Sequence, residues 1–170
     1  MLNKIQYQVD IDRLVADTHK VLSNYSFNRQ NQICFQNTKF GMNNVYEGTG
    51  DSRLPDSPMY QKNEKDFIYF NEEFNDTIFY DIHMHFPGRM RLANLKSKKC
   101  YSMHSDPKLF RYHFAIETNE NCFILYRDGK HHHIPADGYC YIMNADYEHT
   151  ALNAGNTDRI HLIISKNEDS

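Results

Sequence analysis

Several kinds of residue and segment are scarce in this sequence. Tryptophan is absent, and no stretch approaches the roughly 18 consecutive apolar residues that a membrane-spanning helix needs. The first ten residues, MLNKIQYQVD, contain no apolar run of the kind found in a signal peptide. We therefore expect a protein of the cytoplasm that has no membrane partner.

Cysteine is sparse and unpaired in the sequence. The four cysteines (Cys34, Cys100, Cys122 and Cys140) lie far apart, and no C-x-x-C motif is present. This spacing argues against a zinc knuckle or a redox dithiol. We expect reduced thiols that are small and mostly buried.

The sequence also lacks a surplus of positive charge. It has 19 Lys and Arg against 22 Asp and Glu, for a net charge of −3 and a pI near 6.3. A nucleic-acid partner held through phosphate contacts is therefore not expected. With 40% hydrophobic and 24% charged residues, the composition is that of a globular protein, and 170 residues predict one domain.

Residues 1–87 are predicted to hold two helices and a long loop. After a short alternating strand over 4–9, Asp10 is a suitable N-cap for a helix that ends near residue 24. A second helix is predicted over 72–86, where apolar residues recur every four positions after Asn71. Residues 41–65 are rich in Gly, Pro, Asn, Asp and Ser, so they predict a loop, either a substrate lid or a plain connection.

From residue 88 to about 167 the hydrophobic period changes to two. Short alternating runs are separated by turn sequences at 127–130, 135–138 and 153–156. Short strands at this spacing, with no helix between them, predict a β-sandwich or barrel. The expected fold is therefore mainly β, with the two helices packed on the β-core.

Strand parity predicts a polar interior. Because alternate residues of a strand share a face, Arg111 and His113 lie opposite Phe114 in the run 111–117. Arg159 and His161 likewise share one face of the run 159–164. This pattern suits a barrel that binds a ligand inside and packs its apolar exterior on helices.

One motif carries the predicted chemistry. His104 and Asp106 form an H-x-D pair, and His149 follows at a distance suitable for a neighbouring strand. Two imidazoles and one carboxylate are the ligands that hold non-heme Fe(II) and leave further coordination positions open. Arg159, ten residues beyond His149, offers a guanidinium that can pair with the far carboxylate of a dicarboxylate co-substrate.

The segments MHSDPKLFRYHFAIET (103–118), PADGYCYIMNADYEHTALNAG (135–155) and DRIHLII (158–164) resemble the aspartyl/asparaginyl β-hydroxylase-like family of Fe(II)/2-oxoglutarate dioxygenases. The resemblance implies a double-stranded β-helix, or cupin-type jelly roll, with iron bound by His104, Asp106 and His149. It also implies that Arg111, His113 and Arg159 hold 2-oxoglutarate. Aspartyl β-hydroxylases themselves lack the acidic ligand, so Asp106 places the resemblance nearer to the proline-hydroxylase-like branch.

The expected activity is O2-dependent hydroxylation of a free amino acid or of an amino-acid side chain in a peptide or protein. Succinate and CO2 would be the co-products. Two other classes fit the same ligands: a cupin-type isomerase or lyase that does not use 2-oxoglutarate, and a metal-binding sensor module. Binding of 2-oxoglutarate to the metal-loaded protein would separate the first expectation from these.

Other polar residues are weaker candidates. Arg91 precedes the first ligand and is positioned to meet a substrate carboxylate, whereas Asn144 and Asn153 flank His149 and are candidates to orient it. His161 is more typical of a hydrogen-bonded interior histidine. The tract His131–His133 is expected at the exposed start of a hairpin strand and is not expected to bind metal. His83 and His85 are expected to point apart on a helix, so this pair is not expected to bind metal either.

Overall fold

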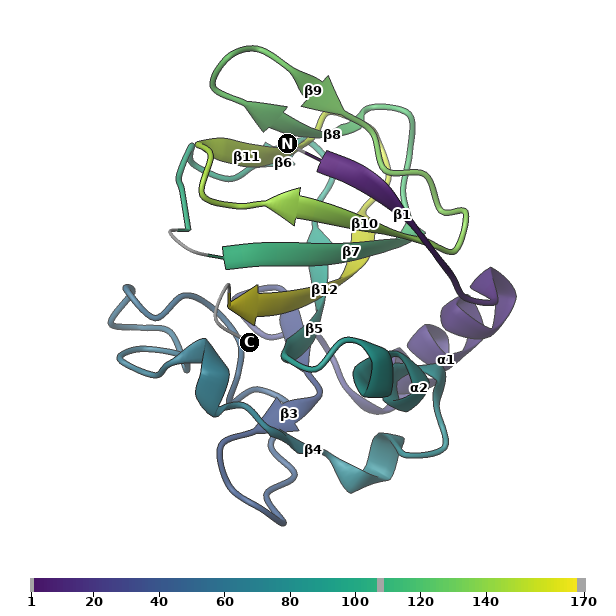
Figure 1. The fold of residues 1–170 in the computed structure, drawn as a ribbon, viewed down its shortest axis with the longest axis vertical. Coiled ribbons are helices and arrows are strands. Elements are labelled where there is room, and N and C mark those ends of the chain that lie inside the picture. The colour runs from purple at the N-terminus through teal and green to yellow at the C-terminus, as the bar shows by residue number, and fades with distance from the viewer. Residues whose placement is uncertain (1, 107–108, 168–170) are drawn as a thin grey trace.

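A six-stranded antiparallel sheet forms the larger layer of the protein (Figure 1), in a computed structural model that describes residues 2–106 and 109–167. The strand order is β1-β10-β7-β12-β5-β2. The bounds are β1 Leu2–Gln8, β2 Gln32–Cys34, β5 Arg89–Leu95, β7 Leu109–Glu117, β10 Tyr139–Asn144 and β12 Arg159–Asn167. Strand β12 lies between β7 and β5 and pairs with both, so it runs through the middle of the sheet.

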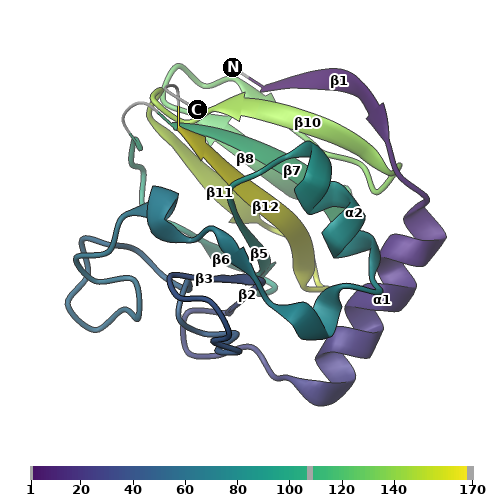
Figure 2. The ribbon, with the colours of Figure 1, turned by 60° about the horizontal axis from the view of Figure 1, so that its bottom comes forward.

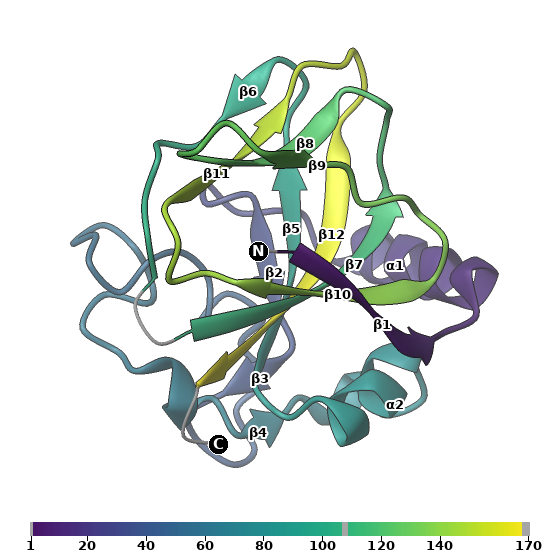
Figure 3. The same ribbon diagram turned by 45° about the horizontal axis from the view of Figure 1, so that its top comes forward.

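A smaller four-stranded sheet faces this layer (Figure 3). Its order is β6-β11-β8-β9, with β6 Lys99–Cys100, β8 Cys122–Tyr126, β9 His131–His132 and β11 His149–Asn153. Apolar side chains from both sheets share one buried cluster, including Met143 and Tyr141 from the larger sheet and Ile124 and Ala151 from the smaller. The two facing antiparallel sheets form a jelly-roll-like sandwich, which confirms the predicted mainly β fold.

The two helices cover the outer face of the larger sheet (Figure 2). They are α1, Ile11–Asn24, and α2, Ile78–His85. Leu14 of α1 and Phe79 of α2 are buried in one cluster with Phe114 and Leu162 from the sheet. The predicted split between an apolar outer face and a polar inner face of β7 and β12 is therefore confirmed.

The start of the first helix was predicted correctly, but that of the second was not. Asp10 caps α1 by accepting hydrogen bonds from the backbone N–H groups of Asp12 and Arg13. The second helix begins only at Ile78, because Asn71 caps a separate 3-10 helix over Glu72–Phe74. A carboxylate from α1 supplies the missing cap, since Asp17 accepts a hydrogen bond of 2.7 Å from the Ile78 N–H.

Besides the strand, helices and loop that the sequence predicts for residues 1–87, this part of the chain forms three further short strands. Strand β2 extends the larger sheet by pairing with β5, and β3 (Gln36–Asn37) pairs with β4 (Tyr69–Phe70). Strand β1 pairs with β10, so both edges of the larger sheet come from the N-terminal half of the chain. Across the described ranges, no helix is long and apolar enough to cross a membrane.

Candidate metal centre

A cavity of about 940 Å³ lies between the two sheets. Its walls come from the inner faces of β5, β7 and β12 on one side and of β8 and β11 on the other. The loop over residues 50–64, which ends in a 3-10 helix at Glu64–Asp66, closes one side. His104, Asp106, His149, Arg111, His113 and Arg159 all line this one cavity.

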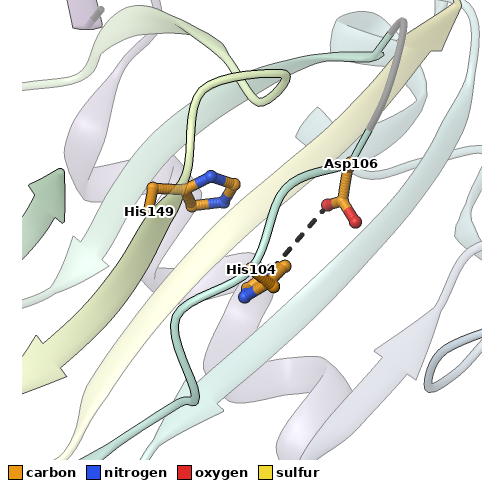
Figure 4. Close-up of side chains that lie close together, drawn as sticks. All are labelled: His104, Asp106 and His149. Atoms are coloured by element: carbon orange, nitrogen blue, oxygen red, sulfur yellow. Dashed lines mark ion pairs between the residues drawn. The ribbon is translucent and has the colours of Figure 1, made fainter. Parts of the chain in front are cut away.

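The backbone holds the three predicted metal ligands together (Figure 4). His104 lies between β6 and β7 and forms an isolated antiparallel bridge with His149, the first residue of β11. The two backbone N–H groups donate to the opposite carbonyls at 3.0 and 2.8 Å. The Asp106 N–H donates to the Ala145 carbonyl at 2.8 Å, which fixes the third residue against the turn before β11.

Hydrogen bonds fix the protonation of both histidine rings. The Nδ1 atom of His104 lies 2.9 Å from the Ser102 carbonyl oxygen, and that of His149 lies 2.8 Å from the Tyr147 carbonyl oxygen. A carbonyl only accepts, so each Nδ1 carries a proton and donates, which leaves each Nε2 as the ring atom that can bind a metal. Burial also lowers the pKa of His149, although the Tyr147 carbonyl works in the other direction. Metal-ligating histidines are commonly oriented by such a hydrogen bond from the other ring nitrogen.

The donor set fits a single divalent ion. One possible ligand atom from each residue lies within 4.8 Å of the others, and His104 Nε2 is 3.9 Å from Asp106 Oδ2. Ligand atoms at neighbouring positions around one ion, each about 2.1 Å from it, lie about 3–3.5 Å apart, so these side chains would have to close in by up to about 1.5 Å on an ion. Among the described residues, no cysteine lines the cavity. Two imidazoles with one carboxylate suit Fe(II) better than a structural zinc ion, which usually draws on thiolates.

Two arginines neutralise the carboxylate of Asp106. Arg111 donates to Oδ2 at 3.0 Å, and Arg53 donates to Oδ1 at 3.2 Å. Burial by itself would raise the pKa of Asp106, but Arg111, His104 and Arg53 together lower it. The group is therefore ionised at neutral pH, and a carboxylate has enough lone pairs to bind a metal while it keeps these hydrogen bonds.

Arg159 has the opposite environment, because it has no acidic partner. Its side chain is only 2% exposed, its Nε has no hydrogen-bond partner, and no carboxylate in the described ranges forms an ion pair with it. The neighbouring rings of His113 and His161 lie 5.8 Å apart, and neither ring has a partner for either nitrogen. Burial, followed by the charge of Arg159, holds the pKa of both histidines well below the usual range.

This group of one guanidinium and two neutral imidazoles has unmet hydrogen-bonding capacity in the interior. A buried polar group without a partner is costly, and an anion that accepts several hydrogen bonds removes that cost. A ligand carboxylate fits these donors. The arrangement suits the far end of a diacid whose near end reaches the metal site.

A family model described as aspartyl/asparaginyl beta-hydroxylase matches residues 61–167, which is more than half of the chain. This chain belongs to the aspartyl/asparaginyl β-hydroxylase family. The match includes all three candidate metal ligands and Arg159, and it supports an oxygenase-type hydroxylase activity. Among curated proteins, no sequence matches this family member.

Three solved structures are similar to this β-hydroxylase family member in part. A Pseudomonas putida prolyl-4-hydroxylase shares 11% identity and a TM-score of 0.45, covering 95% of this chain and 84% of its own. A cupin domain from Bordetella pertussis shares 14% identity and a TM-score of 0.39, over 46% of this chain and 80% of its own. A non-heme monooxygenase, ThoJ, in a nickel complex shares 19% identity and a TM-score of 0.33, over 45% of this chain and 42% of its own.

Several other candidates lie away from the centre of this hydroxylase. Asn144 accepts from the N–H of Asp146, and Asn153 donates to the carbonyls of Leu95 and Thr157, so each stabilises a local turn or strand contact. Neither lines the cavity. Within the described part of the chain, the only group of His, Cys, Asp or Glu side chains arranged for a metal is the predicted one. His131 and His132 form strand β9, with His131 exposed, as predicted.

The sequence did not identify the residues by which the loop over residues 50–64 reaches the site. Glu64 accepts hydrogen bonds from Arg111 at 2.8 Å and from Arg89 at 3.0 Å. Arg53 bridges Asp51 and Asp106. The loop composition was the only available signal, and it predicted a loop that was either a substrate lid or a plain connection, without indicating which side chains point inward. Arg111 also differs from expectation, since Glu64 and Asp106 already engage it.

Proposed function

We propose that this chain is an Fe(II)- and 2-oxoglutarate-dependent dioxygenase that hydroxylates an amino acid or an amino-acid side chain in a peptide. One observation supports this most strongly. His104, the ionised Asp106 and His149 share a cavity with the buried guanidinium of Arg159, which forms no ion pair with any carboxylate of the described residues. Family membership adds the hydroxylase activity.

In the proposed reaction, a substrate C–H bond, O2 and 2-oxoglutarate give the C–OH product, succinate and CO2. One oxygen atom enters the hydroxyl group and the other enters succinate. Bound ferrous iron would supply the activation of O2 that no amino-acid side chain provides.

The side chains of the protein hold and orient the reactants. His104, Asp106 and His149 would bind the metal, and the carbonyls of Ser102 and Tyr147 fix the orientation of the two rings. Arg159 would pair with the distal carboxylate of 2-oxoglutarate, with His113 beside it as a neutral hydrogen-bonding group. Arg111 would keep Asp106 in place and add positive charge near the chelating end of the co-substrate.

The direct test is succinate release by the full chain with ferrous iron, O2 and 2-oxoglutarate, with and without each free amino acid. Wild-type protein should form succinate, and amino acids that are substrates should accelerate it. His149→Ala should lose metal binding and turnover while the fold remains, as judged by circular dichroism. The absence of succinate, together with no binding of 2-oxoglutarate to the metal-loaded protein by calorimetry, would contradict the proposal and favour an isomerase, a lyase or a sensor.

A further inference from the structure

The cavity carries more positive charge than its own carboxylates neutralise. In the described part of the chain, six cationic side chains line it, against three carboxylates. The cations are Arg53, Lys62, Arg89, Arg91, Arg111 and Arg159, and the carboxylates are Asp51, Glu64 and Asp106. A ferrous ion and the dianion of 2-oxoglutarate cancel each other. Lys62 is paired with Glu47, which lies outside the lining, so the proposed reactants would leave a surplus of two positive charges.

Four of these cations have an acidic partner, but among the described residues Arg91 and Arg159 have none, and Arg159 is the proposed anchor of 2-oxoglutarate. Arg89 and Arg111 share Glu64, and Arg53 is paired with Asp51 and Asp106. The Arg91 side chain instead donates a hydrogen bond from Nη1 to the Ser165 hydroxyl at 3.1 Å.

Arg91 is also deeply buried. Its side chain is 7% exposed, and its Nε has no partner. Burial, with the nearby charges of Arg89 and Arg111, lowers the pKa of Arg91 to about 9. The guanidinium is still charged at neutral pH, so it faces the cavity as a buried cation without an anion, an arrangement that is costly unless a ligand supplies one.

Strand register separates Arg91 from the proposed co-substrate anchor. On β5, Arg91 lies opposite Ile163 of β12, whereas Arg159 lies opposite Leu95 at the other end of the same pairing. The two arginines are thus four residues apart along the ladder, about 13 Å of backbone. In the proposed function, Arg159 holds the distal carboxylate of a diacid, and the near end of that diacid reaches the metal. Arg91 is then free for a second molecule.

We infer that the substrate carries a carboxylate that pairs with Arg91, so the enzyme selects acids over the corresponding neutral amides. This inference rests on the proposed function and narrows its substrate class. A free amino acid presents such a group as its α-carboxylate, and a peptide presents it at its C-terminus or through an Asp or Glu side chain. A guanidinium fork binds a carboxylate through two parallel hydrogen bonds, which a carboxamide cannot reproduce.

The test compares acids with amides as ligands of the metal-loaded full chain in the presence of 2-oxoglutarate, without O2. The probes are the twenty free amino acids, their carboxamides, and end-blocked tripeptides centred on Asp, Asn, Glu or Gln. The readouts are ligand-induced shifts in Tm without O2 and substrate-stimulated succinate release with O2. We expect at least one acid to bind about ten- to a hundredfold more tightly than its amide, as a buried charge-assisted pair implies.

Arg91→Gln should reduce this acid-over-amide preference to within about threefold, and Arg91→Lys should keep part of it because the charge remains. Arg13→Gln, an exposed arginine on α1 that pairs with Asp81, is the matched control and should retain the full preference. The comparison on wild-type protein stands even if Arg91→Gln does not fold.

Equal binding of acids and amides by wild-type protein would overturn the inference, as would an undiminished preference in a folded Arg91→Gln variant. A variant that loses only affinity for 2-oxoglutarate would also overturn it, because Arg91 would then serve the co-substrate. Failure of every acid to raise Tm at millimolar concentration counts against it as well. Acid-selective binding without any succinate formation would instead contradict the proposed function and leave the carboxylate site supported.

Discussion

At the scale of single residues, the arginines that line the cavity carry the same charge but have different partners. Arg111 contacts Glu64 and Asp106, so its charge is used within the protein. Arg159 is more deeply buried and has no carboxylate within ion-pair distance in the described ranges. A residue of the first kind organises the site, and a residue of the second kind is available to a ligand.

The first prediction concerns Arg159. Replacing Arg159 with Gln removes the charge that the distal carboxylate of 2-oxoglutarate would meet, so we expect the affinity for 2-oxoglutarate to fall about 10- to 100-fold. Metal binding should change little, because Arg159 forms no hydrogen bond with His104, Asp106 or His149. Calorimetry on the manganese-loaded full chain measures both quantities. Arg127→Gln, at a strongly exposed arginine, is the control, and equal affinities in the two variants would assign the co-substrate to another anchor.

Glu64 provides a pH-dependent prediction. Burial alone would raise the pKa of Glu64, but Arg111, Arg89 and Arg91 hold it well below its usual range. A carboxyl group whose pKa is lower in the folded state stabilises the protein above its unfolded pKa. That stabilisation is lost as the pH falls through the folded value.

We therefore expect Glu64→Gln to lower the free energy of unfolding by about 3 kcal/mol at pH 7, because the buried guanidinium of Arg89 loses its carboxylate and that of Arg111 loses one of two. The difference from wild type should begin to shrink below about pH 4, where Glu64 of the unfolded chain becomes protonated, and it should continue to fall as the pH approaches the lower pKa of the folded state. Urea denaturation at pH 7, 5 and 3 measures this. Glu120→Gln, at an exposed turn, should show less than about 0.5 kcal/mol at each pH. A constant difference across the range would show that Glu64 acts by packing alone.

At the scale of elements, the loop over residues 50–64 is attached to the metal centre at both of its ends. Near its start, Arg53 donates to the Ser105 carbonyl at 3.3 Å and to Asp106 at 3.2 Å. At its end, Glu64 joins Arg89 of β5 to Arg111 of β7. Ion pairs hold this irregular segment against the cavity. Ion pairs exchange partners more easily than the side chains of a packed apolar core do. Of the two roles that the loop composition left open, a substrate lid and a plain connection, these contacts favour the lid.

Arg53→Gln should loosen this loop. The lost pairs are half-exposed and are each worth under about 1 kcal/mol, so we expect amide hydrogen exchange over residues 51–62 to accelerate about two- to fivefold. Arg29→Gln removes an exposed pair with Asp56 in the same loop but makes no contact with Asp106, and it should leave the exchange nearly unchanged. Equal acceleration in both variants would mean that surface charge, and not attachment to Asp106, controls the loop.

At the scale of the whole molecule, the metal centre joins segments that are remote in sequence. His149 belongs to the smaller sheet, whereas Asp106 lies just before β7 of the larger sheet. An ion bound by both would link the two sheets across the cavity. Ligand binding to the folded state alone raises the stability of the entire domain.

Ferrous iron at about 100 times its dissociation constant should therefore stabilise the full chain by about 2.7 kcal/mol. For a domain of this size that is a rise in Tm of about 5–10 °C. Anaerobic differential scanning calorimetry measures the shift. His149→Ala should abolish it, and His131→Ala, on exposed strand β9, should retain it. A shift that survives His149→Ala would place the metal elsewhere.

The sequence by itself determined what depends on local pattern. Asp10 as a helix cap, the turns at 127–130, 135–138 and 153–156, and the polar face of β7 and β12 all follow from short-range spacing, and the structure has them. The H-x-D pair and the later histidine predicted three candidate ligands, which the structure brings within 4.8 Å of one another. These features were predictable because the period of two and the N-cap preference act over a few residues.

Only the tertiary structure decided what depends on partners remote in sequence. Asp17 caps α2 from another helix, β2 and β3 acquire strand geometry by pairing with β5 and β4, and Glu64 reaches Arg111 across 47 residues. Whether a buried arginine is neutralised or left without an anion follows from the same long-range packing. Sequence fixes which charges exist, and folding selects which of them meet, since Coulomb attraction depends on a distance that no local pattern contains.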